Sequence, residues 1–341
     1  MLLRLESRSP MPGKNFKAPS TYYFMFIRNL LFASCLVIIA GPAQAQQERP
    51  TTDTAQEDNL MSMLSEDTPA LHQKSYVAAT FKATRIINGH SIENVGQGVL
   101  DFRVSHRFGA VKNGIKDFFG LDGATTRLGL DYGITNWLMV GIGRSTLNKE
   151  VDGSFKAKVL RQTESGNIPV SLSVMGSTGI QTTAAPAMPP GSEYYFSNRV
   201  AYTGQLLIAR KFSNRFSMQL MPTVVHYNLV PLEADPNNVL SIGVGGRLKL
   251  SQRISLTGEY YYNIEQIKGS TNALAFGMDI ETGGHVFQLM FTNSNGITDR
   301  SFIGETTGTW GNSDIHFGFN ISRVFTIVKP KGMAGMRNKI W

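Results

Sequence analysis

The chain has 341 residues, of which 17% are charged, and its formal net charge is +8. Soluble proteins average roughly 25% charged residues, and no stretch gathers Lys and Arg into the basic face that a nucleic-acid partner requires. The single cysteine excludes a disulfide framework, so the sequence predicts neither nucleic-acid binding nor thiol chemistry.

The first 45 residues have the pattern of a secretory signal. Arg28 precedes the apolar run LLFASCLVIIA, and the small residues of GPAQA end at Ala45. We therefore predict residues 1–45 as a signal peptide that is cleaved after Ala45. The apolar run is too short to span a membrane as a helix, and Met25 is a better start for a short basic region than Met1.

Two consequences follow from removing this segment. Cleavage takes away five Lys and Arg residues and one acidic residue, so the net charge of +8 falls by four. It also removes Cys35, the only cysteine. The alternative is a lipoprotein that is cleaved just before Cys35, but that cleavage would cut the apolar run in half.

Residues 46–75 are acidic, polar and interrupted by proline. We predict an acidic flexible linker, and the short apolar patch at residues 60–64 leaves open a docking helix as the alternative. A strand-like pattern, SYVAATFKATR, covers residues 75–85 at the start of the next segment, residues 76–98. This segment is predicted as an extra strand or a plug, which pairs at an edge, lies in the periplasm or sits inside a lumen.

Residues 99–325 alternate strand patterns with turn signals. VLDFRVSHRF sets the pattern, because apolar and charged residues alternate with the period of two that marks a β-strand. Pro222 interrupts one of the strands and indicates a bulge or an edge. We predict strands at residues 99–108, 125–133, 137–147, 153–162, 168–180, 197–212, 216–227, 239–250, 254–264, 273–281, 285–293 and 314–325.

The connections between these strands indicate a membrane barrel. The turns ITN, SNR, SQR and TGG are short, whereas most of the alternate connections are longer. Outer-membrane barrels have an even number of strands, short periplasmic turns and longer extracellular loops. The predicted fold class is therefore all-β, a transmembrane antiparallel barrel of about twelve strands, followed by a periplasmic tail at residues 326–341.

The charged faces of the strands indicate which face of the sheet points into the lumen. An Arg or Lys on the lipid face costs about 2–4 kcal/mol at the bilayer midplane, so these charges should point inward. A soluble β-sandwich or a lipocalin-like barrel would show similar alternation, but the signal, the low charge and the inward glycines favour the membrane. The lumen-lining candidates are Asp101, Arg103, Arg107, Arg127, Asp131, Lys156, Lys158, Arg247, Glu259 and Asp279.

Three stretches resemble a known family. DFRVSHRFG, FFGLDGATTRLGLDYGITNWLMVGIGRS and FGFNISRVF are similar to a family of Gram-negative outer-membrane β-barrels classed as a domain of unknown function. The similarity runs from about residue 56 to about residue 330. It implies a barrel in the bacterial outer membrane, and it implies no activity and no catalytic residues. The tail IVKPKGMAGMRNKIW departs from barrels that end on their last strand.

No motif in the chain predicts chemistry. The six histidines show neither HxxxH nor HExxH spacing, GVGG lies mid-strand with no helix after it, and no Ser lies in GxSxG. We predict no catalytic residue, no cofactor and no metal site. The chain is expected not to be an enzyme, although a hydrolase at the barrel rim stays open as the least favoured alternative.

Passage or binding of a small polar solute is the leading hypothesis for function, because the predicted lumen is charged. The alternative is a structural or assembly barrel whose lumen is filled by paired charges. The expected partners are outer-membrane lipid, a small polar solute and the barrel-assembly machinery, which would act through the last strand. The sequence does not name the solute.

Overall fold

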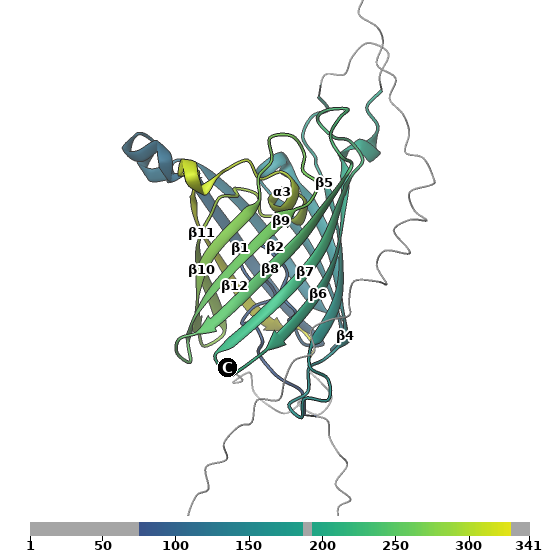
Figure 1. Ribbon diagram of the computed structural model, residues 1–341, viewed down its shortest axis with the longest axis vertical. Coiled ribbons are helices and arrows are strands. Elements are labelled where there is room, and N and C mark those ends of the chain that lie inside the picture. Colours follow the sequence, from purple (N-terminus) through teal and green to yellow (C-terminus); the bar gives the residue numbers. More distant parts are fainter. Residues whose placement is uncertain (1–74, 187–192, 329–341) are drawn as a thin grey trace, which may run out of the picture. The chain divides into compact units, whose positions relative to one another are not determined.

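The computed structural model describes residues 75–186 and 193–328, which form a closed antiparallel barrel (Figure 1). The predicted signal peptide and most of the predicted linker and tail lie outside the described residues. Each strand pairs with its neighbours in sequence, and β1 closes the ladder on β12. The strands are β1 (Val99–Ala110), β2 (Ala124–Gly133), β3 (Leu138–Ser145), β4 (Val151–Leu160), β5 (Ser171–Ile180), β6 (Val200–Lys211), β7 (Phe216–Tyr227), β8 (Asn238–Lys249), β9 (Ile254–Asn263), β10 (Ala273–Thr282), β11 (His285–Thr292) and β12 (His316–Thr326).

The twelve predicted strands are confirmed, with ends that differ by a few residues. The burial of β1 follows its sequence, because Asp101, Arg103 and Arg107 are buried while Phe102 is exposed. The same alternation runs through β8 and β9. A strand with a period of two has one polar and one apolar face, and the apolar face must contact an apolar environment. In this barrel the apolar faces form the outer wall, as in barrels that contact lipid.

The two ends of the barrel differ in the length of their connections. Short turns join β2 to β3, β6 to β7, β8 to β9 and β10 to β11. The first residue of β1 and the last residue of β12 lie at this same end of the barrel. We take it as periplasmic because bacterial barrels keep their short turns there. No helix among the described residues is long and apolar enough to cross a membrane.

The expectation of a bulge or an edge at Pro222 is wrong. Gln205 pairs with Thr223 and Ile208 with Leu220 in one unbroken register, and Pro222 stays opposite Ile242 on the other side. The closed ladder has no edge. Only the pair at the proline and the pair next to it are missing from the β6–β7 ladder. Proline has no N–H to donate to the neighbouring strand.

Residues 75–98, called here the lumenal segment, run inside the barrel. Tyr76 bridges Thr163 near the periplasmic rim, and Arg85 bridges His90 to form a narrow loop. The loop is closed by hydrogen bonds from Ile86 N to Gly89 O (2.8 Å) and from Ser91 N to Thr84 O (3.0 Å). The segment is therefore not a thirteenth strand of the wall.

A second element enters the barrel from the opposite end. Helix α3 (Asp299–Gly304) belongs to the long connection between β11 and β12, and all six of its residues are buried. Figure 1 shows it within the upper mouth of the barrel. Thr298 caps its first turn, because its side chain and that of Ser301 each bond the other's backbone. The remaining described helices are short 3-10 turns, η1 (Val111–Gly120), η2 (Leu147–Lys149), η3 (Phe196–Arg199) and η4 (Trp310–Asn312).

Candidate functional site: the filled lumen

The ten residues that sequence analysis assigned to the lumen lie on the inward-facing positions of their strands. Nine of them are buried, and Lys158, near the periplasmic end of β4, is half-buried. They do not form one site. They are spread around the wall. Hydrogen bonds to the lumenal segment are made by six of them, Arg103, Arg107, Asp131, Lys156, Arg247 and Glu259. The described set is Asp101, Arg103, Arg107, Arg127, Asp131, Lys156, Lys158, Arg247, Glu259 and Asp279.

Two groups of these charges pair within the wall. Arg103 Nη2 lies 2.6 Å from Asp101 Oδ2 and 3.8 Å from Asp131 Oδ2. Arg127 Nε donates to Asp152 Oδ1 at 2.8 Å. A buried carboxylate needs such partners, because leaving a charge unpaired in the interior costs several kcal/mol.

Glycines on the inner face make room for the Arg127 side chain. A Cβ atom at Gly129 would lie 2.5 Å from Arg127 Nη1, and one at Gly143 would lie 2.2 Å from Nη2. Both distances are too short for a real contact. The two inward glycines therefore leave the space that the guanidinium occupies.

The ammonium group of Lys156 binds the backbone of the lumenal segment. Its Nζ donates to the carbonyl oxygens of Thr84 at 3.3 Å, Ser91 at 2.8 Å and Glu93 at 2.5 Å. Lys156 is fully buried. Three acceptors match the three N–H donors of an ammonium group, so the segment supplies the polar shell that this cation needs.

Glu259, on β9, binds the tip of the same segment through its carboxylate. The backbone N–H groups of Ile87 (3.2 Å), Asn88 (2.8 Å) and Gly89 (3.1 Å) all donate to it. Gly89 is required by space, since a Cβ there would lie 2.2 Å from Tyr261 Oη. The backbone of the segment thus binds a buried cation through its carbonyl oxygens and a buried anion through its N–H groups.

Side chains from other strands complete this polar shell. Arg107 Nη2 donates to Asn88 Oδ1 at 2.8 Å, and Arg247 Nη1 donates to Ala79 O at 2.9 Å. Gln288 Nε2 donates to Ile86 O at 2.8 Å and also to Asp279 Oδ1 at 3.0 Å. Polar contacts to the segment therefore come from opposite sides of the wall.

The lumenal segment and helix α3 meet inside the barrel at Asp299. Arg85 Nη1 lies 3.2 Å from Asp299 Oδ1, and the fully buried His90 places its Nε2 3.5 Å from Oδ2. Ser177 on β5 donates to the same Oδ2 at 2.8 Å. Asp299 therefore links the periplasmic element, the extracellular element and the wall.

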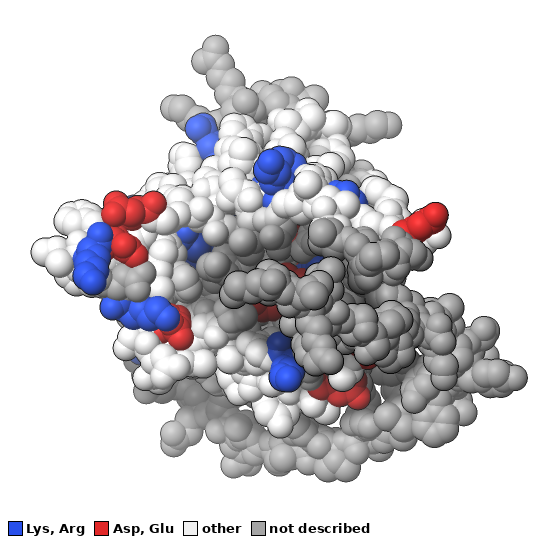
Figure 2. Space-filling model, turned by 90° about the horizontal axis from the view of Figure 1, so that it is seen from above, with Lys and Arg blue, Asp and Glu red and all other residues white. Residues whose placement is uncertain are grey.

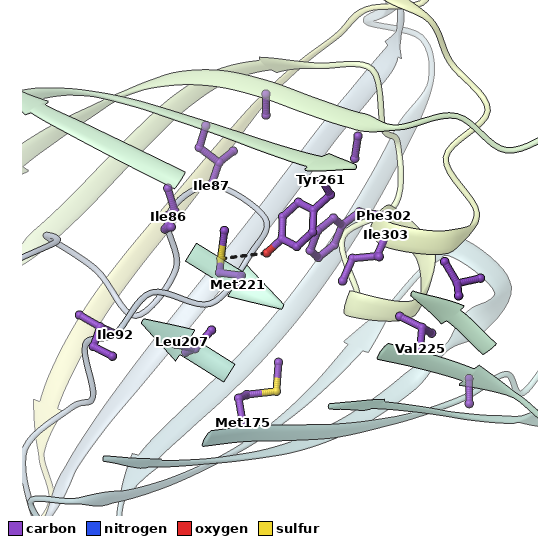
Figure 3. Packing of buried hydrophobic residues seen from close by; sticks show 14 of the residues in the cluster. Ile86, Ile87, Ile92, Met175, Leu207, Met221, Val225, Tyr261, Phe302 and Ile303 are labelled. Carbon is purple, nitrogen blue, oxygen red and sulfur yellow. Dashed lines mark hydrogen bonds between the residues drawn. The ribbon is translucent and has the colours of Figure 1, made fainter. Parts of the chain in front are cut away.

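An apolar cluster packs beside this junction (Figure 3). Ile86 of the segment, Phe302 of α3 and Met221 of β7 contribute to it, and the Tyr261 hydroxyl donates to Met221 Sδ at 3.2 Å. The rings of Tyr261 and Phe302 meet edge to face with centroids 5.1 Å apart. Part of the inner wall is thus apolar, which the strand patterns did not predict.

Two carboxyl groups of the extracellular connections have shifted pKa values. Burial alone would raise the pKa of Asp299, but the facing His90 and Arg85 outweigh it and hold that pKa below its usual range. Burial raises the pKa of Glu150, which precedes β4, to about 7, although Arg300 partly opposes the shift. Glu150 is thus an acid that titrates near neutral pH beside the α3 connection.

Several residues of this site were not predicted. Asp152, Gln288 and Asn320 lie at inward positions, and the period of two that selected the charged candidates would have selected them as well. Asp299 and His90 carried no usable signal, because they belong to connections whose path the strand pattern does not fix. No group of three or more potential metal ligands occurs in the described part of the chain.

Charge on the end of the molecule seen in Figure 2 is mixed. Among the described residues on this face, basic and acidic side chains are interspersed, and neither sign forms one extended patch.

Comparison with known proteins identifies the fold family. The model of a family described as "Membrane bound beta barrel domain (DUF5777)" matches residues 81–325. No curated protein matches the sequence.

Solved structures with a similar fold include the NanC porin, at 11% identity and a TM-score of 0.43 over 67% of this chain and 100% of that one. The KdgM porin has 9% identity and a TM-score of 0.40 over 67% and 99%. The COG4313 outer membrane channel from Pseudomonas putida F1 has 13% identity and a TM-score of 0.43 over 69% and 98%.

Proposed function

The chain belongs to the membrane bound beta barrel domain family (DUF5777), and on that premise we propose that it is a gated passage for a small polar solute. Its apolar outer wall and its family assign the barrel to the bacterial outer membrane. In this proposal the lumenal segment is the gate, and the passage is closed in the conformation described above. The solute crosses when the segment leaves its position along the charged inner wall.

One observation carries the proposal, namely that two buried charges of the wall, Lys156 and Glu259, are hydrogen-bonded to the lumenal segment. The hydrogen bonds of Lys156 and Glu259 go to backbone groups of residues 84–93. A permanently dry interior would be at least as stable with apolar residues at these positions. When the segment is released, these wall charges stay solvated only if water takes its place. Their presence therefore supports a lumen that fills with water when the passage opens.

The composition of the wall indicates the class of solute. Arg103, Arg107, Lys156 and Arg247 alternate with acidic and amide side chains around the interior. Such a surface offers hydrogen-bond donors and acceptors of both signs. This charged part of the inner wall suits a small hydrated polar molecule.

A second candidate function is a permanently filled barrel that serves as a structural or assembly element. The apolar cluster favours it, because Ile86, Met221, Tyr261 and Phe302 pack as a protein core does. Opening the passage would expose this cluster to water. The two candidates therefore differ in whether the segment ever leaves.

A reversible cross-link separates them. An ideal Cβ at Gly245 lies 2.3 Å from Ile86 Cδ1 and 3.6 Å from Ile86 Cγ1, so the Ile86 side chain points at this position, and Ile86→Cys with Gly245→Cys puts one thiol on each side of the contact. The double variant is made with Cys35→Ser, which removes the only native cysteine. Conductance is recorded in planar bilayers before and after reduction, with each single-cysteine variant as the control.

We expect the oxidised double variant to be silent and the reduced one to show opening events like those of the single variants. Equal conductance with and without the cross-link would contradict the lumenal segment as the gate. Silence of every variant, reduced or oxidised and across applied voltages, would favour the permanently filled barrel.

A further inference from the structure

Residues 109–123, which are the end of β1 and its connection to β2, project sideways from the barrel and are called here the lateral loop. It contains η1 and reaches past the wall at the extracellular end in both views (Figures 1 and 2). The lateral loop takes no part in the proposed passage. Its shape and its exposed side chains indicate a separate role.

The base of the lateral loop is fixed by backbone contacts. The β1–β12 register shifts between Arg107 and Ala110, and such a bulge turns the chain away from the sheet. Gly109 N donates to Gly123 O at 3.0 Å. A Cβ at Gly120, whose φ is +89°, would lie 2.2 Å from Gly109 O. Only glycine permits this close approach of the two backbone segments, so the sequence itself fixes the base of the lateral loop.

The tip of the loop presents large apolar side chains to its surroundings. Ile115 is 81% exposed, Phe118 59% and Phe119 55%, and Leu121 is also exposed. Phe118 and Phe119 have φ values of 44° and 56°, in the left-handed region that bulky residues rarely adopt. Two consecutive strained and exposed aromatic residues indicate that the loop is shaped for a contact outside the protein.

The wall beneath the loop identifies that contact. Phe108, two residues before the end of β1, stacks on Phe317 with centroids 5.7 Å apart, and Phe317 also meets Phe291 at 5.4 Å. His106 stacks on Phe319 at 5.1 Å. These rings are on the outward face near the extracellular ends of β1, β11 and β12, where barrels carry the aromatic girdle of the membrane interface.

The lateral loop continues this lipid-contacting surface outward at the same level. Lys116 is exposed beside Ile115, and Lys112 pairs with Asp314 while keeping part of its side chain exposed. Asp117 and Asp122 equal the two lysines in number. A loop of aromatic, aliphatic and charged side chains has the amphipathic character suited to the lipid headgroup region. Lysines there would meet lipid phosphates.

We propose that the lateral loop lies on the outer leaflet of the membrane, with Ile115, Phe118 and Phe119 inserted among the lipids and Lys112 and Lys116 at the level of the phosphates. The occupant of this surface is lipid. The loop anchors the extracellular end of β1 and β2 against the bilayer.

Site-directed spin labelling tests this assignment. Ile115→Cys and, separately, Phe118→Cys are introduced with Cys35→Ser, labelled with a nitroxide, and reconstituted into vesicles of phosphatidylethanolamine and phosphatidylglycerol. Collision of the label with oxygen, which enters lipid, is compared with collision with a water-soluble nickel chelate. Leu128→Cys on the outer wall serves as the lipid reference, and Glu233→Cys on an exposed connection at the same end serves as the water reference.

We expect the oxygen-to-nickel collision ratio at both loop positions to be several-fold higher than at Glu233 and close to that at Leu128. A ratio equal to that at Glu233 at both positions would overturn the proposal, because the loop would then lie in water. Low collision with both reagents, together with an immobilised label, would overturn it in favour of a protein contact. Retention of the folded electrophoretic form by each variant keeps these outcomes interpretable.

Discussion

Replacing Glu259 by Gln tests how the lumenal segment is held. The carboxylate accepts three backbone N–H groups, those of Ile87 and Gly89 on Oε2 and that of Asn88 on Oε1. A glutamine with its amide oxygen at the Oε2 position keeps the first two bonds and turns its NH2 group toward the N–H of Asn88. A buried N–H left without an acceptor costs about 1–3 kcal/mol, so the equilibrium between the bound and the released segment should shift at least about fivefold toward release.

Release of the segment is measured by thiol labelling. Ala83→Cys, at a buried position of the segment, is made with Cys35→Ser, and the rate of its reaction with a charged maleimide is recorded in lipid vesicles. Glu259→Gln should raise this rate at least about fivefold, because the buried thiol reacts only when the segment opens. Glu233→Gln, on an exposed connection, is the matched control and should leave the rate unchanged. Equal rates in all three backgrounds would refute the claim that Glu259 holds the segment.

Three further outcomes are expected. Gly89→Ala should destabilise the bound segment by about 1–3 kcal/mol through overpacking and raise the labelling rate, whereas Gly311→Ala, which meets nothing within 4 Å, should not. Burial raises the pKa of Glu150 from 4.5 to about 7, so stability present below pH 4.5 is lost as the pH rises through 7. Glu150→Gln should remove that loss, at most about 3 kcal/mol, in heat-modifiability assays on both sides of pH 7. Arg127→Met should cost about 3–5 kcal/mol by leaving Asp152 unpaired, and adding Asp152→Leu should recover much of it in the same assay.

The wall of the barrel could be predicted from sequence because each strand carries its own two-sided pattern. In β9, Glu259 and Thr257 alternate with apolar residues, so burial of one face follows without knowledge of any neighbour. Turn signals then fix the strand ends, and the alternation of short and long connections fixes which end is periplasmic. These signals are local, and they survive in a single sequence.

The contents of the lumen could not be predicted in the same way. Residues 80–92 are almost all buried, so apolar Ile86 and polar Asn88 are both enclosed and no exposed face remains to give a period. The strand-like alternation of their first residues is overridden by contacts with many different strands. Helix α3 has six residues and only a local capping signal, and its position depends on Asp299 meeting Arg85, far away in the chain.

Amide hydrogen exchange tests the central claim, that the lumenal segment fills the barrel, most directly. With the full chain in lipid vesicles, the amides of Ile87, Asn88 and Gly89, which donate to Glu259, should exchange far more slowly than those of exposed connections such as residues 232–235. Exchange at 87–89 as fast as in those connections would contradict the account, since the segment would then lie outside the barrel in solution.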